Sequence, residues 1–307
     1  MLLTNVISKF CICNFEAEIN KPSMNSNVNK PIVLNLNIGD QLTSISCGHI
    51  VVELIKFILY QRLQIPYCYQ WLKQIINKRK ECENKDQKES FQSERHFHVA
   101  STALQNLDMT LKSVLQEISG SSIPVEVCIA LGATPVTCRE VYRLLLPTIC
   151  HKPQCHSDDI ATDQKIQRTM FRSLVTSEQL SQVFLNTLPP TNMYVFLRKK
   201  TPENQEAILS TSNFLFTDGC RIPRTSKIVV IDFRSENPSS LACCSGFPVF
   251  GDINQDEKCE DLGLHINDYN EIESTDDLKW FQSSYVMKGF KDCVINGSSV
   301  TNQWLNS

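Results

Sequence analysis

Apolar residues recur every three or four positions in several stretches of the chain, the spacing that places them on one face of a helix. In the first stretch they stand at Ile50, Val51, Leu54, Ile55, Ile58 and Leu59. Ser44 or Ser46 can cap this helix, and Pro66 prevents it from continuing. Further helical patterns cover residues 67–77, 96–118, 138–145 and 157–184.

Runs rich in β-branched and aromatic residues, bounded by turn residues, predict strands. The clearest is VEVCIAL at 125–131, which has the composition of a buried strand. Later runs lie at 193–198, 214–216 and 227–233, and an apolar cluster at 280–290 predicts a terminal strand pair. Because helices come first and strands last, the pattern predicts an α+β fold with a mostly antiparallel sheet.

Polar stretches suggest how the chain is divided. Residues 1–40 are rich in asparagine and are expected to form a flexible tail, within which 32–36 can form a short strand. Residues 78–95 hold 11 charged side chains in 18 positions and are expected to be a solvated linker. Residues 234–275 are expected to be an acidic insertion, since 252–277 contains ten Asp and Glu against one Lys. We therefore expect one domain over 41–293 and a C-terminal tail over 294–307.

Composition and charge exclude several classes of protein. With 42% hydrophobic residues the chain can bury a core. A net charge of −3 and a pI of about 6.1 argue against nucleic-acid binding, which usually requires a basic surface. The longest apolar stretch contains Glu53 and Lys56, so no membrane span is expected. The 14 cysteines lie largely within helical and strand patterns, which favours free thiols in a reducing compartment over a disulfide scaffold.

The nearest approach to a reactive site is the pair Cys150-His151 and Cys155-His156. Thiolate and imidazole together suit zinc, but adjacent residues cannot easily reach one ion, so an ordinary loop is favoured. A small zinc or thiol enzyme built on this loop stays open as an alternative. The sequence contains no glycine-rich phosphate loop, GxSxG or HExxH motif. A non-enzymatic protein without a cofactor is therefore expected.

Two segments carry a resemblance to a known family. ELIKFILYQRLQIP at 53–66, and WFQ at 280–282 with KGFKD at 288–292, resemble motifs of the Mad-two-binding family, also called comet. The long helix, the VEVCIALG strand and the helix with Met170-Phe171-Arg172 fall between them in matching order, so the resemblance covers most of 40–292. It implies a HORMA-like fold, in which three helices pack on a mostly antiparallel sheet and a C-terminal segment forms a safety belt.

The resemblance implies a non-enzymatic adaptor. Members of that family bind the closed conformer of the spindle-checkpoint protein Mad-two and present it to an AAA+ remodelling ATPase. The outcome is disassembly of the mitotic checkpoint complex and silencing of the spindle assembly checkpoint. This role implies residence in the nucleus and cytoplasm, and in the region of the mitotic spindle and kinetochore. The alternative within the same fold is a HORMA protein that entraps a closure-motif peptide under its own safety belt.

The sequence departs from the family pattern in the loop that is expected to contact the ATPase. The family presents a Pro-Lys pair in the loop before Arg221-Ile222-Pro223, and Phe216-Thr217 occupy the nearest positions here. Cations that could replace the lysine are Lys199, Lys200, Arg224 and Lys227.

The resemblance assigns partner binding to Gln61 and Phe171, and Arg168 and Arg172 extend that patch. A stripe at positions 166, 170 and 174 is expected to face the core, and at about 100° per residue Phe171 points away from it. An aromatic ring flanked by arginines suits an interface anchor. The alternatives from the residues alone are a core Phe at the edge of the stripe and an exposed Gln61 at the end of its helix.

Overall fold

The computed structural model describes residues 30–38, 42–82, 90–120, 122–147, 149, 160–200, 213–217, 222–223, 225–234, 278–295 and 297–306. The helices are α2 (Ser44–Gln61), α3 (Tyr69–Cys82), α4 (Phe91–Ser119), α5 (Ile160–Thr176), α6 (Glu178–Leu185) and α8 (Val300–Asn306). The strands are β1 (Ile32–Asn35), β2 (Glu126–Gly132), β3 (Cys138–Leu145), β4 (Asn192–Lys200), β5 (Phe214–Thr217), β6 (Lys227–Asp232), β7 (Leu278–Ser283), β8 (Met287–Lys288), β9 (Val294–Ile295) and β10 (Ser298–Ser299).

One large sheet forms the centre of the molecule. Its strands follow the order β1-β6-β3-β2-β4-β7-β5, and β8 pairs with β4 beside β7. Strand β6 runs parallel to both β1 and β3, and the other pairs of this sheet are antiparallel. The prediction of an α+β fold with a mostly antiparallel sheet is therefore confirmed.

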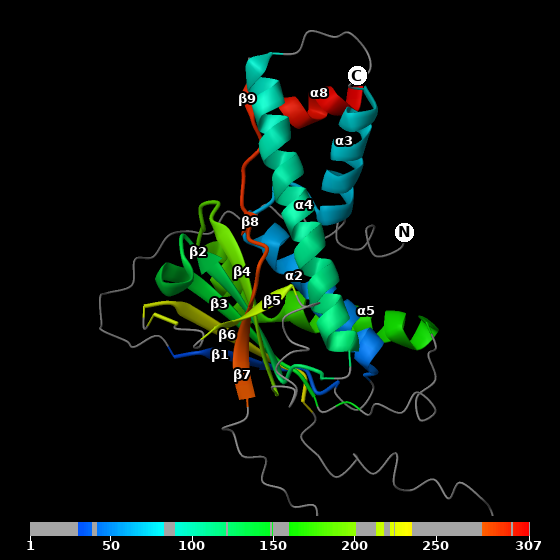
Figure 1. Ribbon diagram of the computed structural model, residues 1–307, viewed down its shortest axis with the longest axis vertical. Coiled ribbons are helices and arrows are strands. Elements are labelled where there is room, and N and C mark those ends of the chain that lie inside the picture. The colour runs from blue at the N-terminus through cyan, green and yellow to red at the C-terminus, as the bar shows by residue number, and fades with distance from the viewer. Residues whose placement is uncertain are drawn as a thin grey trace, which may run out of the picture.

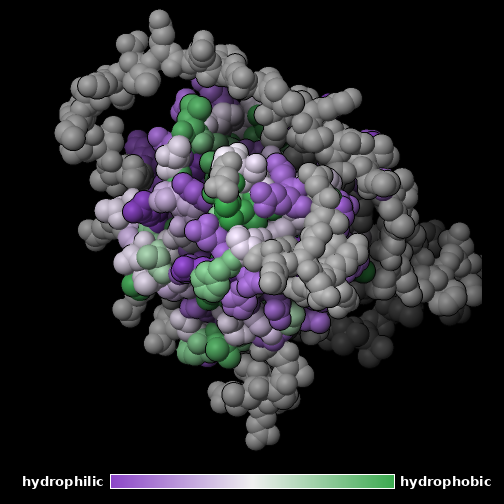
Figure 2. Space-filling model, turned by 90° about the horizontal axis from the view of Figure 1, so that it is seen from above, coloured by the Kyte–Doolittle hydropathy of each residue, from purple (hydrophilic) through white to green (hydrophobic). Residues whose placement is uncertain are grey.

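Helices cover one side of this sheet, and part of the helical layer extends beyond it. Figure 1 shows α2, α4 and α5 beside the sheet, while α3, α8 and the N-terminal half of α4 stand above it. Viewed from above, the described surface is mostly hydrophilic, with scattered hydrophobic side chains (Figure 2). The main core lies between the sheet and the helices, and it contains nearly the whole apolar face of α2.

Helix α2 is capped by neither Ser44 nor Ser46, the two expected caps. Thr43 is the N-cap: its hydroxyl accepts a hydrogen bond from the Ser46 amide at 3.1 Å, and the Thr43 amide donates to the Ser46 hydroxyl at 2.7 Å. This reciprocal arrangement is a capping box. The helix ends at Gln61, shortly before Leu63, whose φ of 54° is left-handed. Its length and hydropathy would suit a membrane span, but most of it is buried in the core.

The structure corrects two predicted helices. Residues 138–145 form strand β3, between β2 and β6 in the middle of the sheet. Residues from 160 onward form two helices, because Ser177 interrupts the pattern and its hydroxyl caps α6 by accepting the Leu180 amide at 3.3 Å. The predicted linker at 78–95 is helical at both ends, as α3 continues to Cys82 and α4 begins at Phe91. The acidic insertion lies almost entirely outside the described residues.

Both expected tails contain ordered structure. Strand β1 belongs to the sheet and pairs with β6 from Ile32 to Asn35. At the other end, β9 and β10 form a hairpin and α8 packs against α3. Trp304 of α8 is only 1% exposed and forms a small separate core with Ile75 and Val300. The chain therefore remains folded beyond the predicted boundary at 293.

The Asp292 carboxylate ties this C-terminal unit to the rest of the domain. Its Oδ2 accepts hydrogen bonds from the hydroxyls of Tyr67, Ser299 and Thr301, at 3.0, 2.5 and 3.0 Å. Its Oδ1 lies 3.4 Å from Nε2 of buried His96. The His96 ring in turn stacks on Trp304, with 5.5 Å between ring centroids. A titratable histidine therefore lies between Asp292 and the docked α8.

We expect this docking to weaken in mild acid. Burial lowers the pKa of His96, and the opposing attraction of Asp292 does not offset that effect. An exposed histidine has a pKa near 6.5, so as pH falls below about 6.5 His96 takes up a proton more readily when α8 is undocked than when it is docked. Hydrogen exchange of residues 300–306, corrected for intrinsic rates, should therefore show less protection at pH 5.5 than at pH 7.5. In His96→Gln this change should disappear; equal or greater protection of the wild type at pH 5.5 would contradict the account.

Candidate partner-binding site

Aromatic packing joins α5, which carries Phe171, to α2, which carries Gln61. The ring of Phe57 on α2 meets Phe171 of α5 edge-on, with 5.6 Å between centroids, and Phe184 of α6 at 6.0 Å. Gln61 follows Phe57 by one helical turn and therefore lies on the same face of α2. Gln61 is half-buried, and its side chain makes no hydrogen bond with the part of the chain that the structure describes. Gln61 and Phe171 thus border one seam between α2 and α5.

The expected outward orientation of Phe171 is wrong. Its side chain is 9% exposed and belongs to the main core, together with the stripe of Ile166, Met170 and Leu174. The stripe predicted from α5 alone was too narrow, because α5 packs beside α2 and α6 as well as over the sheet. A helix with several neighbours buries a wider arc than a helix with one. Phe171 therefore forms the floor of the seam and is not a projecting anchor.

The two arginines do lie at the surface. Arg168 and Arg172 are exposed, and neither guanidinium forms an ion pair within the described ranges of the chain. Val175, which is 47% exposed, follows on the same face at helical spacing. The exposed lysine at 165 adds a further positive charge. We call the face formed by Lys165, Arg168, Arg172 and Val175 the α5 face.

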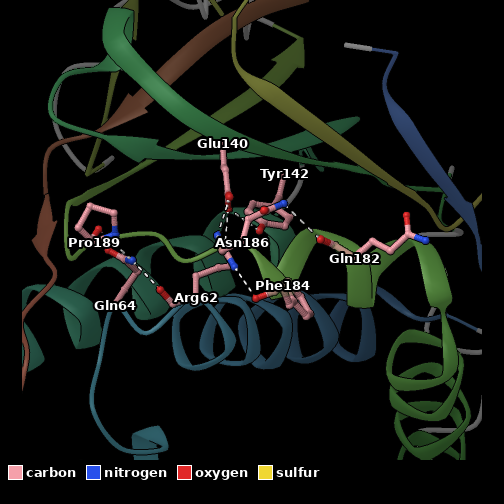
Figure 3. A network of polar contacts seen from close by, with 8 residues as sticks. All are labelled: Arg62, Gln64, Glu140, Tyr142, Gln182, Phe184, Asn186 and Pro189. Carbon is pink, nitrogen blue, oxygen red and sulfur yellow. Dashed lines mark hydrogen bonds and ion pairs between the residues drawn. The ribbon is translucent and has the colours of Figure 1, made fainter. Parts of the chain in front are cut away.

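A buried ion pair fixes the end of α2 against the sheet (Figure 3). Arg62, which is 2% exposed, donates through Nε and Nη2 to the two carboxylate oxygens of Glu140 on β3, both at 2.7 Å. The same guanidinium donates to the carbonyls of Phe184 in the last turn of α6 at 3.2 Å and of Asn186, the C-cap of α6, at 2.7 Å. One side chain therefore joins α2, the sheet and the end of α6.

Tyr142 completes the network. Its hydroxyl donates to Glu140 Oε2 at 2.9 Å. Burial, followed by the nearby Glu140 charge, raises the pKa of Tyr142 well above its ordinary value, so the phenol stays protonated and remains a donor. Sequence reasoning missed this network, because Glu140 was placed in a helix. An arginine at the end of an otherwise apolar helix was the available signal, since a buried guanidinium requires a carboxylate.

The two sequence segments that carry the resemblance meet at Gln64. Its Oε1 accepts the Thr191 amide at 2.7 Å, and its carbonyl accepts the Phe290 amide at 3.0 Å. Gly289 passes so close that a Cβ there would lie 2.7 Å from Gln64 Oε1 and 2.8 Å from the Thr191 carbonyl oxygen. A glycine is therefore required where the C-terminal segment crosses the end of α2.

The arrangement offers a binding surface. The polar groups around Arg62 are satisfied by one another, and the α5 face is exposed and cationic. Within the described residues no group of three or more His, Cys, Asp or Glu could hold a metal. The cluster at Cys150, His151, Cys155 and His156 lies outside the described residues.

We expect the Arg62 network to dominate local stability. Glu140→Gln leaves the guanidinium buried without a counter-charge, which should lower the free energy of unfolding by about 3–5 kcal/mol. Urea denaturation followed by circular dichroism measures this loss. The double variant Arg62→Met, Glu140→Gln should lose less than the two single losses summed, because it leaves no buried charge. A loss below about 1 kcal/mol in Glu140→Gln would show that the pair is solvated and not structural.

Comparison with protein families gives a match over most of the helical part of the chain. A family model described as "p31comet: Mad1 and Cdc20-bound-Mad2 binding" matches residues 17–207, more than half of the 307-residue chain. That range includes α2, α5, α6 and the residues of the Arg62 network. A comparison with curated proteins finds no significant match.

Proposed function

The chain belongs to the p31comet family, a family of binding adaptors, and from this premise we propose that it binds the closed conformer of Mad-two, the Mad2 of the family description, through the α5 face and the end of α2. Mad2 binding is the family's property; the conformer and the surface are our proposal. The single observation that carries the assignment is the family match, which spans the whole of this surface.

The character of the surface supports this proposal. Arg168 and Arg172 are exposed and unpaired by carboxylates of the described residues, so they are available to an acidic partner surface. Val175 adds apolar area beside them, and Gln61 can donate and accept hydrogen bonds at the border of the seam. Such charges act mainly on association rate and specificity, while buried apolar contacts supply affinity. In this proposal Phe171 acts by holding α5 against Phe57.

We assign the fold to the HORMA-like class on three features. Helices α2, α4 and α5 pack on one side of the sheet, and β2, β3 and β4 form its antiparallel centre. The C-terminal strands β7 and β8 both pair with β4, as a closed safety belt would. The two strands predicted within 280–290 therefore do not pair with each other; each pairs with β4.

We further propose that the chain presents Mad-two to an AAA+ remodelling ATPase, so that the mitotic checkpoint complex is disassembled and the spindle assembly checkpoint is silenced. Such a role requires residence in the nucleus and cytoplasm and access to the spindle and kinetochore region. Lys199 is unsuited to the ATPase contact, because its ammonium group is bonded to Glu117 at 2.5 Å. Phe216 is more accessible: it is 56% exposed on the edge strand β5.

Capture of a closure-motif peptide is less well supported. It requires the C-terminal segment to release β4, the Gln64 contacts and the Asp292 cluster together. Binding of Mad-two through the α5 face and the end of α2 requires no such opening.

Charge reversal on the α5 face tests the proposed surface. Arg168→Glu combined with Arg172→Glu should weaken binding to closed Mad-two by at least about tenfold, chiefly through slower association, with an unchanged melting temperature. Surface plasmon resonance measures both rates. Arg95→Glu with Lys112→Glu on exposed positions of α4 is the matched control and should bind normally. Equal affinities for the two double variants would remove the α5 face from the interface.

Substitutions in the seam distinguish a residue that contacts Mad-two directly from one that stabilises the fold around the interface. Gln61→Ala should lower affinity without loss of stability, since its side chain is half-buried and makes no described hydrogen bond. Phe171→Ala should lower the free energy of unfolding by about 3–5 kcal/mol, because its ring is part of the core. Affinity and urea denaturation should be measured on the same preparations, with Phe171→Leu as the variant that retains most of the packing. A stable Phe171→Ala protein that fails to bind would restore Phe171 as a direct contact.

A further inference from the structure

Strand β1 offers a second surface, separate from the α5 face. It lies at one end of the sheet and pairs with β6 along one side; along the other side the described residues provide no neighbouring strand. The Leu36 amide donates to the Asp232 carbonyl on β6 at 2.8 Å. Because successive residues of a strand direct their backbone groups to opposite sides, Val33 and Asn35 present their N–H and C=O groups away from β6. Such an edge can accept another strand.

A groove runs along this free edge. Its volume is about 420 Å³, within the usual range for ligand sites. One wall is β1 from Val33 to Leu36, and the other is the junction of α5 and α6, with Ser173, Leu174, Ser177, Glu178 and Gln179. The helical layer therefore continues past the last strand of the sheet. The groove has the position that one more strand would take.

The lining indicates what kind of side chains the groove accepts. Leu34 and Leu174 supply an apolar floor. The Ser173 hydroxyl donates to the Thr169 carbonyl at 3.1 Å and the Ser177 hydroxyl caps α6, so both have internal partners. Glu178 is the one charged residue of the lining, and it is exposed and meets no cation among the described residues. The groove thus favours an apolar side chain next to a basic one.

We propose that this groove binds an extended peptide segment of a partner protein, which adds to β1 as a further edge strand. Its backbone bonds to Val33 and Asn35, an apolar side chain rests on Leu34 and Leu174, and a lysine or arginine pairs with Glu178. A helix could not use the free edge, because its backbone groups already bond within the helix. The residues involved differ from those of the α5 face, so the proposal stands independently of Mad-two binding.

Selection from a phage-displayed library of random 12-residue peptides tests this on the full chain. Enriched peptides should alternate apolar and polar residues and include a basic one. A fluorescein-labelled synthetic copy of the most enriched peptide should then bind in anisotropy titrations. Asn35→Pro removes an outward N–H without touching the bonds to β6, and should weaken binding at least about tenfold while leaving the far-ultraviolet circular dichroism unchanged.

Matched variants keep the result interpretable. Phe216→Pro removes an outward N–H at the opposite edge, on β5, and should leave peptide affinity unchanged, while Glu178→Gln should lower it about threefold and reduce its salt dependence. If Asn35→Pro does not fold, Ser173→Trp, which fills the groove from an exposed position, should abolish binding instead. Peptides that bind the Asn35→Pro or Ser173→Trp protein as tightly as wild type would overturn the proposal. So would a concentration-dependent dimer that Asn35→Pro dissolves, since a second copy would then occupy the edge.

Discussion

The buried pair of Arg62 and Glu140 is the interaction on which the arrangement of this domain depends. Burying a guanidinium and a carboxylate is costly unless every donor and acceptor is satisfied. Here the carboxylate accepts two bonds from Arg62 and one from Tyr142, and the guanidinium also serves two carbonyls near the end of α6. These bonds are directional, so they fix where α2 and α6 stop relative to β3. The seam between Phe57, Phe171 and Gln61 takes its geometry from that fixed point.

A second constraint closes the domain from its C-terminal end. Gln64 lies two residues beyond Arg62 and holds both the Thr191 amide and the Phe290 amide. Farther along, Asp292 gathers three hydroxyls, and Trp304 is buried between α3 and α4. The C-terminal segment is therefore anchored at successive points. A segment anchored in this way suits a permanently closed adaptor better than a belt that opens around a peptide.

The sequence predicted those elements whose pattern is long or unambiguous. Helices α2 and α4 have sustained apolar spacing, and β2 lies in a short apolar run with β-branched residues that turn residues bound on both sides. Strand β3 was misassigned because its charged residues read as a helix surface, whereas Glu140 is buried against an arginine 78 positions away. Phe171 was predicted to point outward for a related reason: the apolar pattern of α5 describes one helix and does not show that α2 packs against its flank.

The burial of Trp304 could not be predicted, because it lies in a short polar segment whose packing depends on α3 and α4. Gln61, Arg168 and Arg172 could be named as site residues only through the family resemblance, and the packing of Phe57 on Phe171 that joins their two helices came from the fold.

The central claim is that this chain recognises Mad-two in one conformation. Isothermal titration of the full chain with purified closed Mad-two and, side by side, with open Mad-two tests it most directly. The account predicts a one-to-one complex with the closed conformer and at least about a hundredfold weaker binding to the open one, which corresponds to about 2.7 kcal/mol. Equal affinity for both conformers, or no heat with either, would contradict it.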